Sequence, residues 1–294
     1  MSPAAPHATD ETPIVHRRVD LGFPTDVPRH WAGDPVFTRI SDALSLLFPA
    51  GEAFFIQAVN HYKDRIDDEE LRAAVRGFAY QESMHSKEHA AYNAMLEAQG
   101  LDIGWVERGL KTRLKFARRY MPPIMQLAFT ATAEHLTATM AEGLLGAMRE
   151  QEQLAKADPR MRALYYWHAV EEVEHKSVAW DVYHRVAHGG VVRRLIAQVW
   201  VTILVLLNTS LAAGWMLYRD GLLFDLGTWR RAVPLLWGRR GFFTRMVRPF
   251  LRGFRPGFHP RDTPVPQGYR EFVRAWDERS DALAASEQAL AALA

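Results

Sequence analysis

The sequence predicts an all-α fold: a four-helix bundle around a two-metal centre, extended at its C-terminal end by an apolar helix and amphipathic helices. Three observations favour this fold. Long segments carry apolar residues at helical spacing and are bounded by prolines and glycines. Two of these segments each contain a Glu-x-x-His pair, and two others contain a lone glutamate in apolar surroundings. The four elements alternate along the chain in the order that such a bundle requires.

Capping and breaking residues set the bounds of the helical segments. The predicted helices cover residues 36–61, 68–100, 122–156, 161–186 and 267–294. Pro49 and Gly51 interrupt the first one, which predicts either a kink or two helices joined by a loop. Residues 15–34 mix polar residues with glycine and proline, and they predict an extended arm over the bundle, anchored by Trp31.

The segment at residues 167–183, WHAVEEVEHKSVAWDVY, holds the densest group of metal-binding side chains. In a helix each residue turns by about 100°, so three of them fall within about 60° of one another: His168, Glu172 and His175. Glu171 borders this face, whereas Glu174 points away from it and is expected in solvent. A charged helix facing water is the alternative, which the apolar surroundings disfavour.

A similar cluster lies about ninety residues earlier, in FAYQESMHSKEHAAYN at residues 78–93. Glu82 and His85 form the first Glu-x-x-His pair, and His89 follows one turn along the same face. His89 can orient a metal ligand by a hydrogen bond, or it can join two helices. The recurrence strengthens the prediction, because one pair alone would be weak evidence.

The lone glutamates that complete the pattern are Glu52, in LSLLFPAGEAFFIQAV, and Glu134, in LAFTATAEHLTATMAEGLL. Four buried carboxylates without partners would become protonated or would destabilise the fold. Two divalent cations neutralise them. Oxygen and imidazole ligands without thiolates predict two iron ions, with manganese or zinc as alternatives.

The three motifs FPAGEAFFI, FAYQESMHSKEHAAYN and WHAVEEVEHKSVAWDVY resemble the family of predicted metal-dependent hydrolases, from about residue 15 to about residue 260. The ligand pattern also resembles ferritin-like di-iron oxygenases of the p-aminobenzoate N-oxygenase type, whose fourth helix carries an extra histidine one turn before its Glu-x-x-His. The resemblance implies a ferritin-like bundle and seven metal ligands: Glu52, Glu82, His85, Glu134, His168, Glu172 and His175. His89 and Glu171 are expected to contact these ligands rather than the metals.

The 294 residues carry a formal net charge of only +2 and contain no cysteine. A chain without thiols fits a reducing compartment, and the N-terminus lacks the apolar region of a secretory signal, so we expect a cytoplasmic protein. Composition divides the chain into a disordered tail at 1–14, the di-metal bundle at 15–190, an apolar and basic-aromatic segment at 191–262 and a C-terminal helix at 263–294.

Residues 195–218 are long and apolar enough to span a bilayer. A full span, a helix seated at the membrane surface and a buried fifth helix of the bundle all remain open. Residues 229–261 contain nine arginines and no acid, interleaved with aromatic residues, which favours attachment to the inner face of a membrane. The basic segment at 101–122 carries no nucleic-acid motif, so nucleic acid is not an expected partner.

Three functions fit these residues. The first is a di-metal oxidoreductase, an oxygenase, desaturase or N-oxygenase that uses O2 and an electron donor on a small or lipid-like substrate. The second is a metal-dependent hydrolase that activates water with the same ligands. The third is a non-catalytic metal-binding protein. The small side chains around Glu134 and the carboxylate-rich ligand set favour the oxidative enzyme by analogy.

Overall fold

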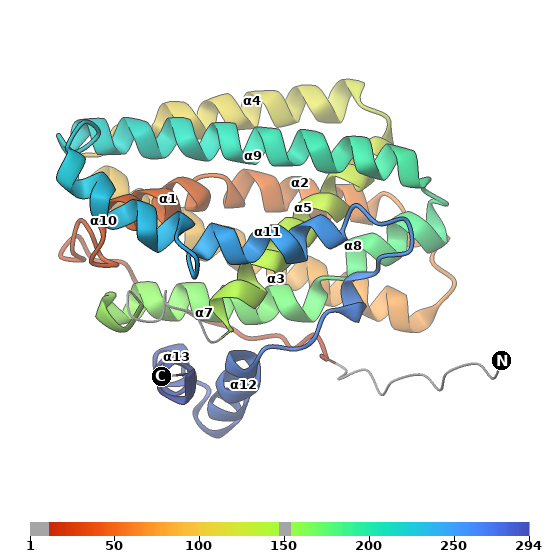
Figure 1. Cartoon of the computed structure of the whole chain (residues 1–294). Coiled ribbons are helices and arrows are strands. Elements are labelled where there is room, and N and C mark those ends of the chain that lie inside the picture. Colours follow the sequence, from red (N-terminus) through yellow and green to blue (C-terminus); the bar gives the residue numbers. More distant parts are fainter. Residues whose placement is uncertain (1–11, 147–153, 294) are drawn as a thin grey trace.

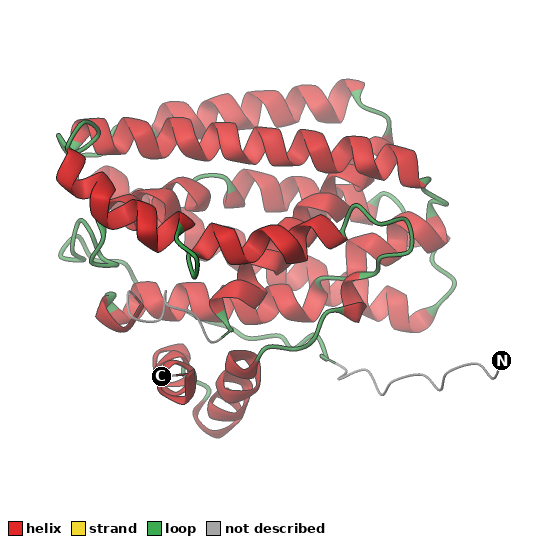
Figure 2. Ribbon diagram, viewed as in Figure 1, coloured by secondary structure: helices red, strands yellow, loops and turns green. Residues whose placement is uncertain are grey.

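In the computed structural model, which describes residues 12–146 and 154–293, all regular secondary structure within those ranges is helical (Figure 1; Figure 2). The predicted all-α fold is confirmed. The helices run in this order: α1 (Pro35–Ser45), α2 (Phe48–Asn60), η1 (Lys63–Arg65), α3 (Glu69–Ala98), α4 (Gly104–Tyr120), α5 (Pro123–Leu144), α7 (Pro159–His175), α8 (Val178–Asp181), η2 (Val182–Val186), α9 (Val191–Arg219), α10 (Leu226–Trp237), α11 (Phe242–Arg252), η3 (Pro260–Asp262), α12 (Gln267–Arg279) and α13 (Ala282–Leu293).

Four helices, α2, α3, α5 and α7, carry the predicted metal ligands and pack on one another. Contacts join α2 to α3, α5 to α7, α2 to α5 and α3 to α7, so the four helices enclose a common centre. Local signals fix their ends. The Asp68 side chain accepts hydrogen bonds from the first backbone N–H groups of α3, and Gly100 follows that helix with a φ of +85°.

The predicted helix at 36–61 is two helices, because the chain breaks at Leu46 and Leu47. Pro49 lies in the first turn of α2, where its missing N–H has no helical partner to lose. It therefore starts a helix instead of kinking one. Glu52 follows in the next turn, with 1 % of its surface exposed.

Three other helix predictions need correction. The helix predicted at 122–156 ends at Leu144, and residues 147–153 of that prediction lie outside the described ranges. The helix predicted at 161–186 breaks after His175, and its last turn is a π-helix. The helix predicted at 267–294 divides at Ser280, which adopts a left-handed conformation with a φ of +51°. Asp281 then accepts hydrogen bonds from two backbone N–H groups and starts α13.

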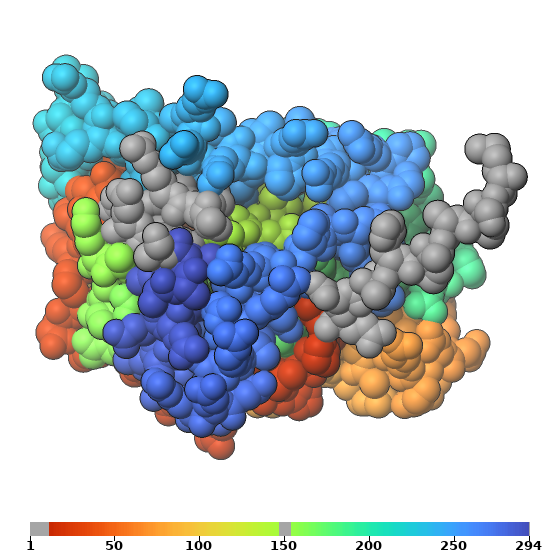
Figure 3. Space-filling model, turned by 60° about the horizontal axis from the view of Figure 1, so that its bottom comes forward, coloured from red at the N-terminus to blue at the C-terminus, as the bar shows by residue number. Residues whose placement is uncertain are grey.

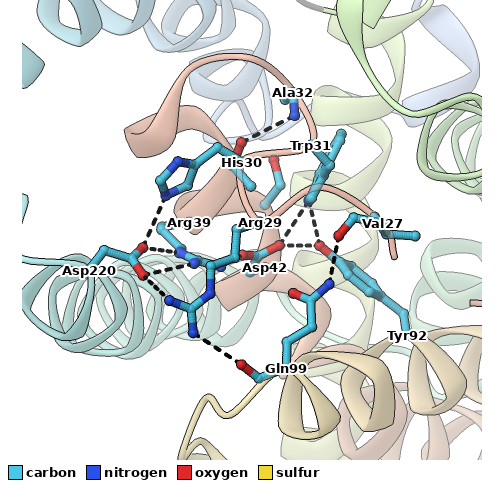
Figure 4. Close-up of polar contacts among 12 residues, drawn as sticks. Val27, Arg29, His30, Trp31, Ala32, Arg39, Asp42, Tyr92, Gln99 and Asp220 are labelled. Atoms are coloured by element: carbon cyan, nitrogen blue, oxygen red, sulfur yellow. Dashed lines mark hydrogen bonds and ion pairs between the residues drawn. The ribbon is translucent and has the colours of Figure 1, made fainter. Parts of the chain in front are cut away.

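The arm at residues 15–34 is fixed to the bundle, as predicted, by Trp31 (Figure 4). The Trp31 Nε1 donates to Asp42 Oδ1 at 3.0 Å and to the Tyr92 hydroxyl at 2.9 Å. Arg39 donates to Asp42 at 2.7 Å and also to Asp220, at the end of α9. This buried network connects the arm, α1, α3 and α9. Most of the predicted tail at 1–14 falls among residues that the structure does not describe.

Helices α4 and α9 run side by side along one edge of the molecule, and α12 and α13 lie at the opposite edge (Figure 1). The C-terminal pair packs on α7 beside the N-terminal arm (Figure 3). Two described segments, Pro35–Arg65 and Val191–Arg219, are long and apolar enough to cross a membrane by length and composition. The first includes Glu52 in the protein core, which shows that this criterion alone does not establish a span.

Candidate metal centre

The seven predicted ligands converge on one region between α2, α3, α5 and α7. None exposes more than 4 % of its surface. Three groups within them bring nitrogen and oxygen atoms to within 4.8 Å of one another: Glu52, His85 and His168; Glu82, His85 and Glu172; Glu82, Glu134 and His175. The shared members link the three groups, so the fold assembles one continuous donor cluster from four separate helices.

At one end of the cluster, the His175 ring meets three carboxylates. Its Nε2 lies 3.2 Å from Glu82, 3.3 Å from Glu134 and 3.4 Å from Glu172. These are close approaches, but Nε2 is not aligned for a hydrogen bond with any of them. The opposite ring nitrogen, Nδ1, is 3.1 Å from the side-chain oxygen of Gln81, which fixes the ring plane.

At the other end, three imidazoles lie in contact: His85 stacks on His168, and His89 meets His168 edge-on. The rings of His85 and His168 lie face to face, 3.9 Å apart between centroids. His168 contacts Glu172 through Nε2 at 2.9 Å and His89 through Nδ1 at 2.7 Å. His89 in turn contacts the Ser45 hydroxyl at 2.9 Å. His89 therefore contacts the predicted ligand His168 on one side and Ser45, which was not among the predicted residues, on the other.

Hydroxyl groups hold two of the carboxylates. Ser86 donates to Glu52 at 2.8 Å, and Thr137 donates to Glu172 at 2.5 Å. Neither Ser86 nor Thr137 is among the residues that the sequence predicts for the site. Both follow a simple signal, because each lies three or four residues from a predicted ligand on the same helix.

Glu174 corrects one prediction from the sequence. It points away from the cluster, as its helical position requires, but it is 5 % exposed rather than solvated. The arm folds over it, and Arg17 donates to its two oxygens at 2.9 and 2.7 Å. Gln81 also donates to Glu174 at 2.7 Å. Glu171 accepts a hydrogen bond from Trp167 Nε1 at 2.9 Å and lies 3.1 Å from the predicted ligand His85.

Electrostatics shows how costly this cluster is without cations. Burial, aided by repulsion from neighbouring carboxylates, raises the pKa values of Glu52, Glu82 and Glu134 well above the ordinary range. Burial also lowers the pKa of His85. Glu172 differs: burial opposes its ionisation, but attraction to His175 and His168 lowers its pKa. The charged form of most of these groups is therefore disfavoured.

The donor atoms fit divalent metal ions. Within the described chain, one oxygen of Glu52, both oxygens of Glu82 and Glu134, and nitrogens of His85 and His175 are buried without a hydrogen-bond partner. Buried polar atoms normally have hydrogen-bond partners. So many unpaired oxygens and nitrogens in one cluster indicate that they share bound metal cations. Oxygen and imidazole donors suit iron, manganese or zinc. The arrangement does not identify the metal.

An apolar cavity of about 80 Å³ adjoins the cluster between α1, α5, α7 and α10. Two members of the donor cluster, His168 and Glu172, line this cavity. Its other walls are mostly aliphatic and aromatic, including Phe48, Met140 and Leu236. A molecule in this cavity would meet the donor cluster directly. The cavity therefore suits an apolar group of limited size.

One comparison with known proteins gives a match. The model of a family described as predicted metal-dependent hydrolase matches residues 15–263. No curated protein and no solved structure matches the chain. The expected likeness to ferritin-like di-iron oxygenases is therefore not confirmed, whereas the likeness to the hydrolase family covers the four helices that bear the cluster.

Proposed function

The chain belongs to the family of predicted metal-dependent hydrolases, and from this premise we propose that its buried cluster holds two divalent metal ions and catalyses hydrolysis of an apolar substrate. The single observation that carries the proposal is the group of orphaned buried oxygens and nitrogens on four helices. The family name implies a metal, and the donor set lacks hydrogen-bond partners within the protein. Both observations indicate the same site. The proposed ligands are the seven residues that the sequence predicted.

Bound divalent ions would supply Lewis acidity, lowering the pKa of water and polarising the bond to be cleaved. The chain supplies geometry. Gln81 fixes the ring plane of His175, His89 fixes that of His168, and Thr137 holds one oxygen of Glu172. Each of these contacts limits the directions in which a donor atom can point, and such partners commonly change metal affinity by about 10–100-fold.

The apolar cavity determines which substrates can reach the site. Its walls next to His168 and Glu172 are mostly apolar and offer few polar partners to a substrate or to water. We therefore propose an ester or amide with a hydrophobic group that fills the cavity. The scissile bond would then lie beside the donor cluster.

Oxygen-dependent oxidation of an apolar substrate is a second candidate, which the donor chemistry favours. Four carboxylates and three histidines form a set that suits iron or manganese, and the adjoining cavity would keep water away from a reactive intermediate. This function would need two iron ions, O2 and an electron donor. The family description favours hydrolysis, so oxidation ranks second.

Metal analysis of the purified protein tests both candidates. We expect about two metal ions per chain, and their absence would refute the proposed site. The metal-free protein is then loaded with Zn²⁺, Mn²⁺ or, without oxygen, Fe²⁺. Cleavage of a hydrophobic model ester by any loaded form supports hydrolysis. Uptake of O2 by the ferrous form, with no ester cleavage by any form, would favour oxidation.

Glu172→Gln and Glu278→Gln form a matched pair for this assay. Glu278 is exposed on α12 and is not one of the clustered donors, so its substitution should leave metal content and activity unchanged. Glu172→Gln should remove both metal and activity, because it replaces a donor carboxylate by an uncharged amide of the same size. Equal behaviour of the two variants would show that the activity arises elsewhere.

A further inference from the structure

The outer face of α9 is apolar over most of its length. Its inner face packs on α1 and α5, but the opposite side leaves large hydrophobic side chains exposed to solvent by 38–71 %. We call this surface the α9 stripe; its members are Val192, Ile196, Val199, Trp200, Ile203, Leu204, Leu206, Leu207 and Leu211. A soluble protein rarely exposes so continuous an apolar surface, so the stripe indicates a binding surface.

The elements beside the stripe are strongly basic. On one side α4 carries six Lys or Arg residues and one acid, and its exposed cations include Arg108, Lys115 and Arg118. On the other side, α10, α11 and their flanks contribute nine arginines and no acid between residues 229 and 261. Exposed aromatic rings, among them Phe116 and Trp237, lie within these same basic elements. An apolar centre with basic and aromatic margins matches an anionic lipid surface.

The inner face of α9 argues against a membrane span. Arg194 is fully buried and donates to backbone carbonyls of Gly253 and Arg255. Gln198 is also buried there. A helix that holds charged and amide groups against the protein on one side can meet lipid only with the other. The arrangement therefore fits a helix that lies along the membrane surface.

An apolar groove connects this surface with the interior. It has a volume of about 220 Å³ between α2, α4, α5 and α9, and Leu204 of the stripe is one of its walls. Four of its lining residues also line the cavity at the donor cluster: Leu44, Phe48, Thr137 and Met140. These four side chains form a wall common to the groove and to the cavity lined by His168 and Glu172.

We infer that the α9 stripe, with α4 and α11 on its two sides, docks on an anionic lipid bilayer, and that the groove between α4 and α9 receives the hydrocarbon chain of a lipid substrate. Membrane docking is inferred from the α9 stripe and its basic margins alone and does not depend on the proposed function. The second half rests on the proposed function, because it supplies a substrate to that site. The substrate class is a long-chain lipid ester or amide drawn from the membrane.

Docking is tested with the full-length protein and vesicles. The protein should sediment with vesicles of phosphatidylcholine containing phosphatidylglycerol, and much less with phosphatidylcholine alone or at high salt. Leu207→Glu should weaken binding at least tenfold, and Arg248→Glu about fivefold. The matched controls are Leu283→Glu and Arg274→Glu, exposed residues at the opposite edge, which should bind normally.

Three results would overturn docking. They are absence of vesicle binding by the wild-type protein, equal losses in Leu207→Glu and Leu283→Glu, and a wild-type dimer that Leu207→Glu converts to a monomer without any vesicle effect. The last result would assign the stripe to a second copy of the chain. Unchanged melting temperatures and metal contents of all variants ensure that lost binding is not lost folding.

The groove is tested by a second pair of variants. Leu204→Trp fills the groove, whereas Leu206→Trp adds the same ring to the stripe outside it. Both should bind vesicles, but only Leu204→Trp should lose at least tenfold in cleavage of a long-chain ester. Cleavage of a short-chain ester should persist in both, which separates this inference from the proposed function. Equal long-chain activity in the two variants would overturn the groove.

Discussion

Glutamine at position 174 should separate the stability of the fold from the composition of the metal centre. Five donors aim at the Glu174 carboxylate, from Val15, Arg17, Gln81 and Tyr269, with Arg17 contributing two. An amide offers one acceptor oxygen and turns its own N–H groups toward the other donors. Arg17, with 1 % of its surface exposed, would lose its main counter-charge. Breaking a buried pair in this way costs about 3–5 kcal/mol.

Thermal unfolding and metal titration, performed on Glu174→Gln and Glu172→Gln together, measure the two effects. Glu174→Gln should lower the melting temperature by roughly 10 °C, with or without metal. It should still bind the full number of ions, with affinity reduced about tenfold because Gln81, which orients His175, loses its partner. Glu172→Gln should instead lose metal at saturation. Equal metal loss in both variants would refute the assigned helix face, and an unchanged melting temperature would refute the role of the arm.

Three further predictions concern protons, charge and backbone. Burial and mutual repulsion raise the pKa values of Glu52, Glu82 and Glu134, so metal binding should release protons and metal affinity should rise with pH. The metal-free protein should lose stability as pH rises from the ordinary glutamate pKa through the raised values. Calorimetry in buffers of different protonation enthalpy measures the released protons, and their absence would contradict the prediction. Burial opposes the ionisation of Asp220, but His30 and Arg39 lower its pKa to about 2. Asp220→Asn should therefore lower the free energy of unfolding in urea by about 2 kcal/mol, equally at pH 7 and pH 5, since both lie above the ordinary aspartate pKa. Ser280→Gly should increase the free energy of unfolding by about 1 kcal/mol and so raise the melting temperature slightly, since glycine adopts a φ of +51° without strain. A lower melting temperature would show that the Ser280 side chain contributes more stability than its conformation costs.

The sequence predicted the donor cluster well because the relevant information is local. Spacing along α3 and α7 places Glu82 beside His85 and His168 beside Glu172, and helix periodicity alone carries that relation. The lone glutamates were found for a different reason: an acid in a long apolar segment requires a partner wherever the helix packs. Neither argument depends on knowing how the helices are arranged.

Glu174 shows where this reasoning ends. Helical phase correctly turned it away from the cluster, but its burial depends on Arg17, more than 150 residues earlier in the chain. No periodicity connects an irregular arm to the back of a helix. The break at Ser280 was missed for a related reason, because no glycine or proline marks it in the sequence and only the left-handed turn reveals two helices.

Charge balance joins these two observations and constrains the centre. Six glutamates are buried in and around it, and the arm accounts for two of them, since Arg17 contacts both Glu171 and Glu174. Of the other four, Glu82, Glu134 and Glu172 have histidines as their only ion-pair partners among the described residues, and Glu52 has a hydrogen bond from Ser86 but no ion pair there. Two divalent ions carry the charge that balances four carboxylates. A single ion would leave two buried negative charges or two retained protons. Metal stoichiometry is therefore a measure of protonation at this centre: binding of only one ion should be accompanied by carboxyl groups that stay protonated at neutral pH, which infrared spectroscopy can detect.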